Sequence, residues 1–236
     1  MTNHTNQPRL NPQIHVKVCG LTNLEDAWVA VEAGADLLGF ILYAKSPRYT
    51  PPEQIGAITQ AIRDRAGDRA GDPVPRFVGV FVDATADELQ TTLSIAGLDY
   101  AQLQGAEPPE VLVALDGRAY KALRPTSVAD AQEAAARYAA LGTADGPSLL
   151  IDAYDAHEYG GTGKKADWHA AATLARAYPR LMLAGGLNPS NVAQAIRTVQ
   201  PWAVDVASGV EIEPRRKDHE AVRSFVRQAK ETFGSG

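Results

Sequence analysis

The sequence is poor in cysteine. Cys19 is the only cysteine among 236 residues, so the chain can form neither an internal disulfide framework nor a CxxC metal cluster. The histidines show no metal-ligand spacing either. We therefore expect no metal site, and we expect the protein to work in a reducing compartment, the cytoplasm.

The sequence also lacks an excess of positive charge and any long hydrophobic run. It carries 23 Lys and Arg against 28 Asp and Glu, which argues against a nucleic-acid partner because phosphate backbones usually bind basic faces. The polar start MTNHTNQPRLNPQ lacks the apolar core of a secretory signal, and no later run is long enough to span a bilayer. We expect neither nucleic acid nor a membrane as a partner, and an anionic ligand would need local cations.

What the chain does have is a regular alternation of two kinds of segment. Short runs rich in Val, Ile and Leu alternate with longer runs rich in Ala, Glu and Arg, which is typical of βα units around a parallel sheet. The apolar runs that predict strands are IHVKVC, DLLGFIL, RFVGVFV, DYAQL, AYKAL, SLLID, RLMLAG and AVDVAS. The helices predicted after them cover 24–33, 52–65, 85–96, 108–115, 127–140, 166–178, 189–199 and 218–232.

Eight strand and helix units in about 220 residues predict one α/β domain, a closed (β/α)8 TIM barrel over residues 14–236. An open doubly wound sheet is the alternative, but such sheets usually have fewer strands. Residues 1–13 are predicted to be a disordered lead-in. Segment 64–76 contains DRAG twice and is rich in Gly, Pro and charge, so it is predicted to be a solvated loop.

Polar residues collect at the carboxyl ends of the predicted strands, where (β/α)8 barrels form their active sites. Cys19, Gln104, Arg124 and Asp152 all stand at such ends. For a lone cysteine in an apolar strand, an inert buried thiol is the ordinary interpretation. For Asp152, the ordinary interpretation is a carboxylate that caps a helix or forms an ion pair in a loop. Arg124 either neutralises a substrate carboxylate or lines the rim.

Small residues follow the last three predicted strands. They are Gly161 and Gly163 after the sixth, Gly185 and Gly186 after the seventh, and Ser208 and Gly209 after the eighth. Backbone N–H groups in such loops can approach a phosphate closely, and the loops after strands seven and eight are the usual phosphate site of this architecture. We therefore predict phosphate binding there, although one glycine pair alone would equally make a tight turn.

The motifs KVCG, KSPRY, GGTG, AGGL and SGVE occur in this order at barrel spacing. Over about residues 14–230 the chain resembles the phosphoribosylanthranilate isomerases of tryptophan biosynthesis. The resemblance implies an Amadori rearrangement without a cofactor, in which Cys19 is the base and Asp152 the acid. It also implies that Arg48 of KSPRY binds the small-molecule phosphoribosyl substrate. The sequence leaves open whether the chain is a monomer or a homodimer.

The sequence departs from this family pattern in two places. Gln104 stands where QLHG usually has histidine, and Pro214–Arg215 replaces the usual PG after SGVE. Gln104 can still hydrogen-bond to a substrate but cannot titrate. Two alternatives remain: a related isomerase of histidine biosynthesis, whose family has an aspartate where Cys19 stands, and a phosphosugar-binding barrel without catalysis.

Lys17 lies two residues before Cys19 and therefore on the same inward face of its strand. A buried lysine needs a counter-charge. Asp205 lies in the last strand, which closes the barrel against the first. We predict a buried Lys17–Asp205 ion pair beneath Cys19, and the Lys17 ammonium should favour the thiolate.

Overall fold

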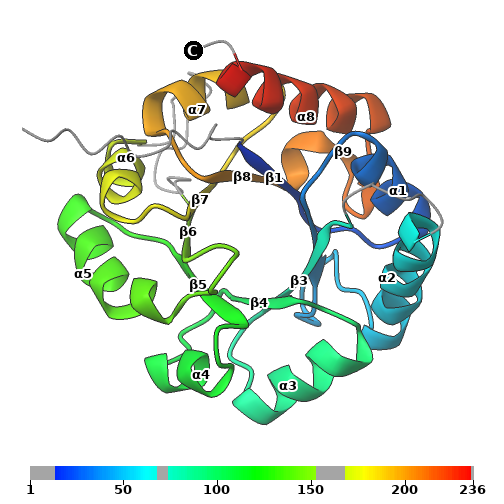
Figure 1. The fold of residues 1–236 in the computed structure, drawn as a ribbon, viewed down its shortest axis with the longest axis horizontal. Helices are drawn as coiled ribbons and strands as arrows, with labels where there is room; N and C mark the ends of the chain where they lie inside the picture. The colour runs from blue at the N-terminus through cyan, green and yellow to red at the C-terminus, as the bar shows by residue number, and fades with distance from the viewer. Residues whose placement is uncertain (1–13, 68–73, 153–167, 235–236) are drawn as a thin grey trace, which may run out of the picture.

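Eight parallel strands form a closed barrel within the residues that the computed structural model describes, 14–67, 74–152 and 168–234 (Figure 1). Each strand pairs with the next in the chain, and the last pairs with the first. The strands are β1 (His15–Val18), β2 (Leu37–Ile41), β3 (Arg76–Phe81), β4 (Tyr100–Leu103), β5 (Ala119–Leu123), β6 (Leu149–Asp152), β7 (Leu181–Ala184) and β8 (Ala203–Val206). The predicted fold class is confirmed.

Helices form a ring outside the barrel (Figure 1). They are α1 (Leu24–Glu32), α2 (Pro52–Gly67), α3 (Ala86–Ile95), α4 (Pro109–Ala114), α5 (Val128–Tyr138), α6 (Trp168–Ala177), α7 (Val192–Val199) and α8 (His219–Gly234). Capping side chains determine where several of these helices begin. Thr85 and Glu88 form a reciprocal capping box at α3, and the Asn23 side chain accepts the Asp26 backbone N–H at 2.8 Å at α1.

The loop predicted over 64–76 is shorter than expected. Helix α2 continues to Gly67, and Arg76 already belongs to β3. The helix continues because Asp64, Arg65 and Ala66 offer no helix-breaking residue before that glycine. Residues 68–73 and the predicted lead-in 1–13 lie outside the described residues.

A small antiparallel hairpin follows β8, where no strand was predicted. It consists of β9 (Glu211–Glu213) and β10 (Arg216–Lys217). Strands of this length are too short to show a period-two pattern in the sequence. Arg215 in the turn has φ 78°, the left-handed conformation that glycine adopts most easily. This is the position at which the resembling family usually has glycine.

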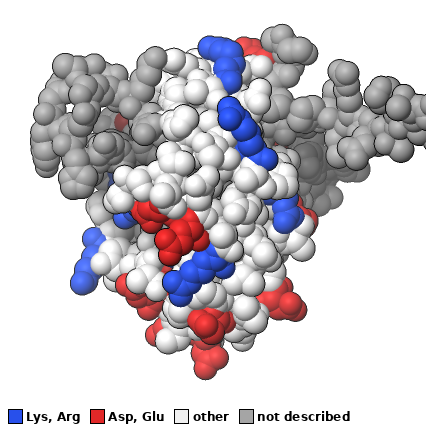
Figure 2. Space-filling model, turned by 90° about the vertical axis from the view of Figure 1, so that its left-hand side faces the viewer, with Lys and Arg blue, Asp and Glu red and all other residues white. Residues whose placement is uncertain are grey.

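The surface mixes charges of both signs. On the side shown in Figure 2, the Lys and Arg side chains are scattered over the face, and most of the Asp and Glu side chains lie in its lower half. Among the described residues, no helix combines the length and the apolar character needed to cross a membrane.

The barrel closes on a buried ion pair. Lys17 stands opposite Asp205 in the β1–β8 register, and its Nζ lies 3.1 Å from both carboxylate oxygens. The same Nζ donates to Gln102 Oε1, which also accepts the Tyr120 hydroxyl. Burial alone would lower the pKa of Lys17, but the Asp205 carboxylate and the Cys19 sulfur raise it above its ordinary value. The predicted ion pair is confirmed, and Lys17 is charged.

Replacing one partner should be costly for stability. Asp205→Ala would leave the Lys17 ammonium buried without a counter-charge, and we expect the free energy of unfolding to fall by about 3–5 kcal/mol. Denaturant unfolding followed by circular dichroism measures this. Glu133→Ala on the exposed side of α5 is the control, with an expected change within about 0.5 kcal/mol. Equal losses in the two variants would contradict the prediction.

Candidate active site

A cavity of about 700 Å³ lies at the carboxyl ends of the barrel strands. Most of the predicted site residues line it. They are Cys19, Gln104, Arg124, Asp152, Gly185, Gly186, Asp205, Ser208 and Gly209. Lys17 lies beneath them through its contact with Asp205. Gly161 and Gly163 lie outside the described residues.

Cys19 follows β1 and is only 5% exposed. Gly39 in β2 leaves the room for it, because a Cβ on Gly39 would lie 2.7 Å from Sγ and 3.0 Å from Lys17 Nζ. Burial raises the pKa of the thiol above its ordinary value, while the ammonium groups of Lys17 and Lys217 pull it down. Lys17 therefore favours the thiolate as predicted, but burial outweighs it.

Gln102, Gln104 and Arg124 lie in a row between Lys17 and Asp152. Gln102, which accepts from Lys17, donates to Gln104 Oε1 at 2.8 Å. In the opposite orientation of the Gln104 amide, its oxygen would instead accept from Arg124 Nη2 at 2.9 Å. Arg124 Nε in turn lies 3.5 Å from Asp152 Oδ2 at the end of β6. Gln104 thus lies between the ion pair inside the barrel and the Arg124–Asp152 pair at the rim, and its single amide oxygen faces donors on both sides.

The loops after β7 and β8 meet in close contact. Gly185 and Gly186 have φ 99° and 62°, conformations in which glycine is strongly favoured. A Cβ on Gly209 would collide with the Leu187 carbonyl group. Ser208 begins the short 3-10 helix η2 (Ser208–Val210) beside them. Glycine here permits the close backbone approach that a phosphate cradle needs.

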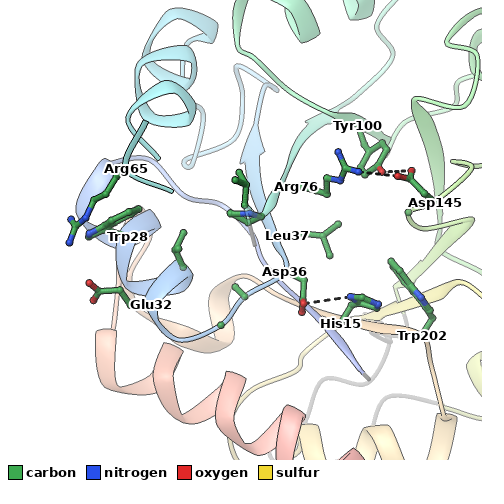
Figure 3. A pocket seen from close by; sticks show the side chains of 16 residues that line it. His15, Trp28, Glu32, Asp36, Leu37, Arg65, Arg76, Tyr100, Asp145 and Trp202 are labelled. Carbon is green, nitrogen blue, oxygen red and sulfur yellow. Dashed lines mark hydrogen bonds and ion pairs between the residues drawn. The ribbon is translucent and has the colours of Figure 1, made fainter. Parts of the chain in front are cut away.

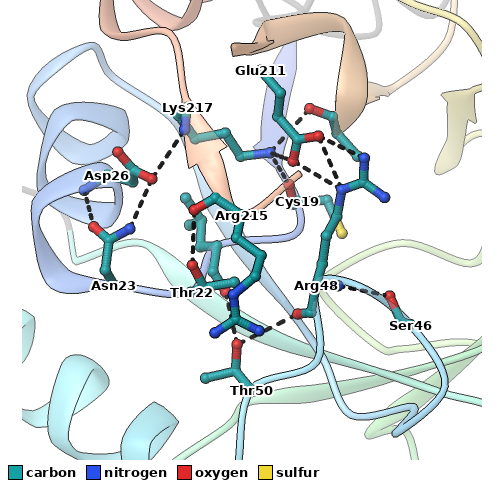
Figure 4. A network of polar contacts seen from close by, with 12 residues as sticks. Cys19, Thr22, Asn23, Asp26, Ser46, Arg48, Thr50, Glu211, Arg215 and Lys217 are labelled. Carbon is teal, nitrogen blue, oxygen red and sulfur yellow. Dashed lines mark hydrogen bonds and ion pairs between the residues drawn. The ribbon is translucent and has the colours of Figure 1, made fainter. Parts of the chain in front are cut away.

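Arg48 lies beside the cavity in a network that includes the hairpin (Figure 4). Its Nε and Nη2 donate to the Glu211 carboxylate at 2.6–3.0 Å. Lys217 Nζ donates to the same carboxylate at 2.9 Å and to the backbone carbonyls of Cys19 and Ala207. Burial alone would raise the pKa of Glu211, but the Arg48 and Lys217 cations hold it below its ordinary value.

Sequence reasoning missed four of these side chains, namely Gln102, Tyr120, Glu211 and Lys217. Gln102 lies two residues before Gln104, so the alternation that placed Lys17 inside the barrel would also have placed Gln102 there. Glu211 closes the SGVE motif, but only the hairpin brings it to Arg48. Lys217 gave no local signal.

A second cavity of about 540 Å³ lies at the amino ends of the strands (Figure 3). Four of its titratable groups lie in two pairs: His15 with Asp36 at 3.6 Å and Arg76 with Asp145 at 3.0 Å. The His15 ring lies against Trp202. Among the described residues, no group of three or more potential ligands is arranged to hold a metal ion.

A thiol and a carboxylate line one cavity at the carboxyl ends of the strands, which is where (β/α)8-barrel enzymes have their active sites. Comparison with known proteins specifies the family. The family model described as N-(5'phosphoribosyl)anthranilate (PRA) isomerase matches residues 16–228. The chain belongs to this family.

Individual relatives agree with the family match. N-(5'-phosphoribosyl)anthranilate isomerase of Geobacter sp. (strain M21) is 46% identical over 219 residues, covering 91% of this chain and 97% of the relative. A crystal structure of monomers generated from the dimeric phosphoribosylanthranilate isomerase of Thermotoga maritima matches this chain with a TM-score of 0.75 and 35% identity. The match covers 92% of this chain and 99% of that one. A solved isomerase in complex with reduced 1-(o-carboxyphenylamino)-1-deoxyribulose 5-phosphate has the same TM-score of 0.75, identity of 35%, and coverage of 92% and 99%.

The ionisation of Cys19 can be measured directly, since no other thiol is present. Burial raises its pKa, so we expect the thiolate absorbance to appear with a midpoint above the ordinary thiol value of about 8.5. The difference between the ultraviolet titrations of the wild type and Cys19→Ser removes the tyrosine signal. A midpoint below the ordinary value would contradict the prediction.

Proposed function

We propose that this chain converts N-(5-phosphoribosyl)anthranilate into 1-(2-carboxyphenylamino)-1-deoxyribulose 5-phosphate, a step of L-tryptophan biosynthesis. The observation that carries the proposal is that Cys19 and Asp152 line one cavity in a chain of this family. The reaction needs both an acid and a base, and the two residues supply one of each. The cytoplasm is the compartment we propose, and both a monomer and a homodimer remain compatible with it.

The acid acts first in the proposed mechanism. Asp152 gives a proton to the furanose ring oxygen, the bond from this oxygen to C1′ breaks, and the substrate becomes a protonated Schiff base. The Cys19 thiolate then removes the proton from C2′. The electron pair of that C–H bond forms a C1′–C2′ double bond and neutralises the nitrogen, giving an enolamine that tautomerises to the ketone.

Binding groups surround this pair. The glycine loops at Gly185 and Ser208 are proposed to hold the phosphate through backbone N–H groups. Arg48 is proposed to bind the substrate carboxylate, since a guanidinium matches a carboxylate in a forked geometry. Arg124 and Gln104 line the rim between Asp152 and the barrel interior.

The alternatives left open by the sequence are now weaker. The matched family is that of the tryptophan-pathway isomerases, and the thiol at Cys19 stands where the histidine-pathway family has an aspartate. A binding protein without catalysis has no need for both Cys19 and Asp152 in one cavity. Turnover decides between catalysis and binding alone.

Complementation tests the function. The wild-type gene should restore growth without tryptophan to an auxotroph that lacks this isomerase. Cys19→Ser and Asp152→Asn should not restore it, and each should lower kcat more than about tenfold, a loss of over ~1.4 kcal/mol of transition-state stabilisation. Circular dichroism of the purified variants controls for folding. A folded variant that kept more than about a tenth of wild-type kcat would remove its residue from the mechanism.

Arg48→Ala should weaken substrate binding. Loss of a charge-assisted forked contact should raise KM at least about tenfold, with a smaller effect on kcat because Arg48 does not move a proton. Inhibition by inorganic phosphate, bound in the glycine loops, should stay within about twofold. Steady-state kinetics measures both. Unchanged KM and kcat would make Arg48 an ordinary loop cation.

A further inference from the structure

We propose that Glu211 is a positioning residue for substrate recognition, which holds Arg48 in the orientation that receives the substrate carboxylate, with Lys217 locking Glu211 in place. This inference rests on the proposed role of Arg48. It concerns the hairpin after β8, whose side chains act on a residue in the loop after β2 (Figure 4).

The first observation is which edge of the guanidinium Glu211 occupies. Arg48 Nε and Nη2 both donate to its carboxylate, with distances of 2.6–3.0 Å. Arg48 Nη1 has no hydrogen-bond partner within the described residues. A guanidinium has a second forked edge, formed by Nη1 and the remaining Nη2 proton. Glu211 therefore fixes the plane of Arg48 and leaves that second edge for another carboxylate.

The second observation is that Lys217 has no proton left for a substrate. An ammonium group donates three hydrogen bonds, and those of Lys217 go to the Cys19 carbonyl at 2.7 Å, the Ala207 carbonyl at 3.0 Å and Glu211 at 2.9 Å. Its side chain is 1% exposed. Lys217 thus acts through Glu211 and through the backbone next to the thiol.

The third observation is the balance of charge. Arg48 and Lys217 carry two positive charges and Glu211 one negative charge, so one positive charge remains for an anionic ligand. The Glu211 side chain is 4% exposed and that of Arg48 20%. In such a buried network the orientation of Arg48 is fixed before the substrate arrives, which lowers the entropy lost on binding.

Orientation and charge predict opposite results for Glu211→Gln. If Glu211 only offset positive charge, its neutralisation would tighten binding of an anionic substrate and lower KM. If it positions Arg48, KM should rise about tenfold with kcat changed less than about threefold. Glu213→Gln, on the same short strand but with a side chain 65% exposed, is the matched control and should leave both constants unchanged.

Glu211→Asp is a second, independent way to distinguish positioning of Arg48 from a purely electrostatic effect. It keeps the negative charge but shortens the side chain by one methylene group. The positioning role predicts a raised KM here as well, whereas a purely electrostatic role predicts wild-type KM. Inhibition by inorganic phosphate should stay within about twofold of wild type in both variants. Weaker phosphate inhibition would mean a general disruption of the site and would overturn the proposal.

A double-mutant cycle with Arg48→Ala closes the test. If Glu211 acts through Arg48, adding Glu211→Gln to Arg48→Ala should raise KM no further. Independent, multiplying effects would overturn the positioning role. If Arg48→Ala itself left KM unchanged, the proposed role of Arg48 would be wrong. If Arg48→Ala raised KM but both Glu211 variants kept the wild-type KM, only the inference about Glu211 would be overturned.

Discussion

The buried contact between Lys17 and Asp205 is the constraint on which the barrel and its cavity both depend. It crosses the seam between β1 and β8, where the first and last strands of the barrel meet. A slip of one residue in this register would turn one of the two side chains out of the barrel and leave the other charge buried alone. The barrel can therefore close only in the register that pairs the two buried charges. The thiol of Cys19 lies directly above this ion pair.

Two lysines lie close to Cys19, and each forms an ion pair with a different carboxylate. Lys17 is paired with Asp205 inside the barrel, and Lys217 is paired with Glu211 at the rim. Both ammonium groups lower the pKa of the thiol, but burial raises it by the largest effect and the Asp205 carboxylate raises it as well. The arrangement thus places two cations close enough to stabilise a Cys19 thiolate at a site whose burial opposes its formation.

The sequence was sufficient for the barrel because each strand is a short apolar run that is followed by a longer segment rich in Ala, Glu and Arg. Period-two alternation also placed Lys17 inside, and the closure rule then gave Asp205 as its partner. The hairpin could not be found this way, since its strands are too short to carry a pattern. Glu211 and Arg48 are 163 residues apart in the chain, and only the folded hairpin brings them together. The roles of Gly161 and Gly163 stay predictions, because the structure does not describe them.

The single cysteine gives this protein a chemical label at a known place. A reagent specific for sulfhydryl groups can attach only at Cys19, so the mass of one adduct per chain identifies the modified atom without peptide mapping. Because the side chain is 5% exposed, attachment reports how often the cavity admits a small molecule to its floor. The rate of adduct formation therefore depends on access to Cys19 and on the fraction of thiolate, and the final stoichiometry counts the chains whose thiol a reagent can reach.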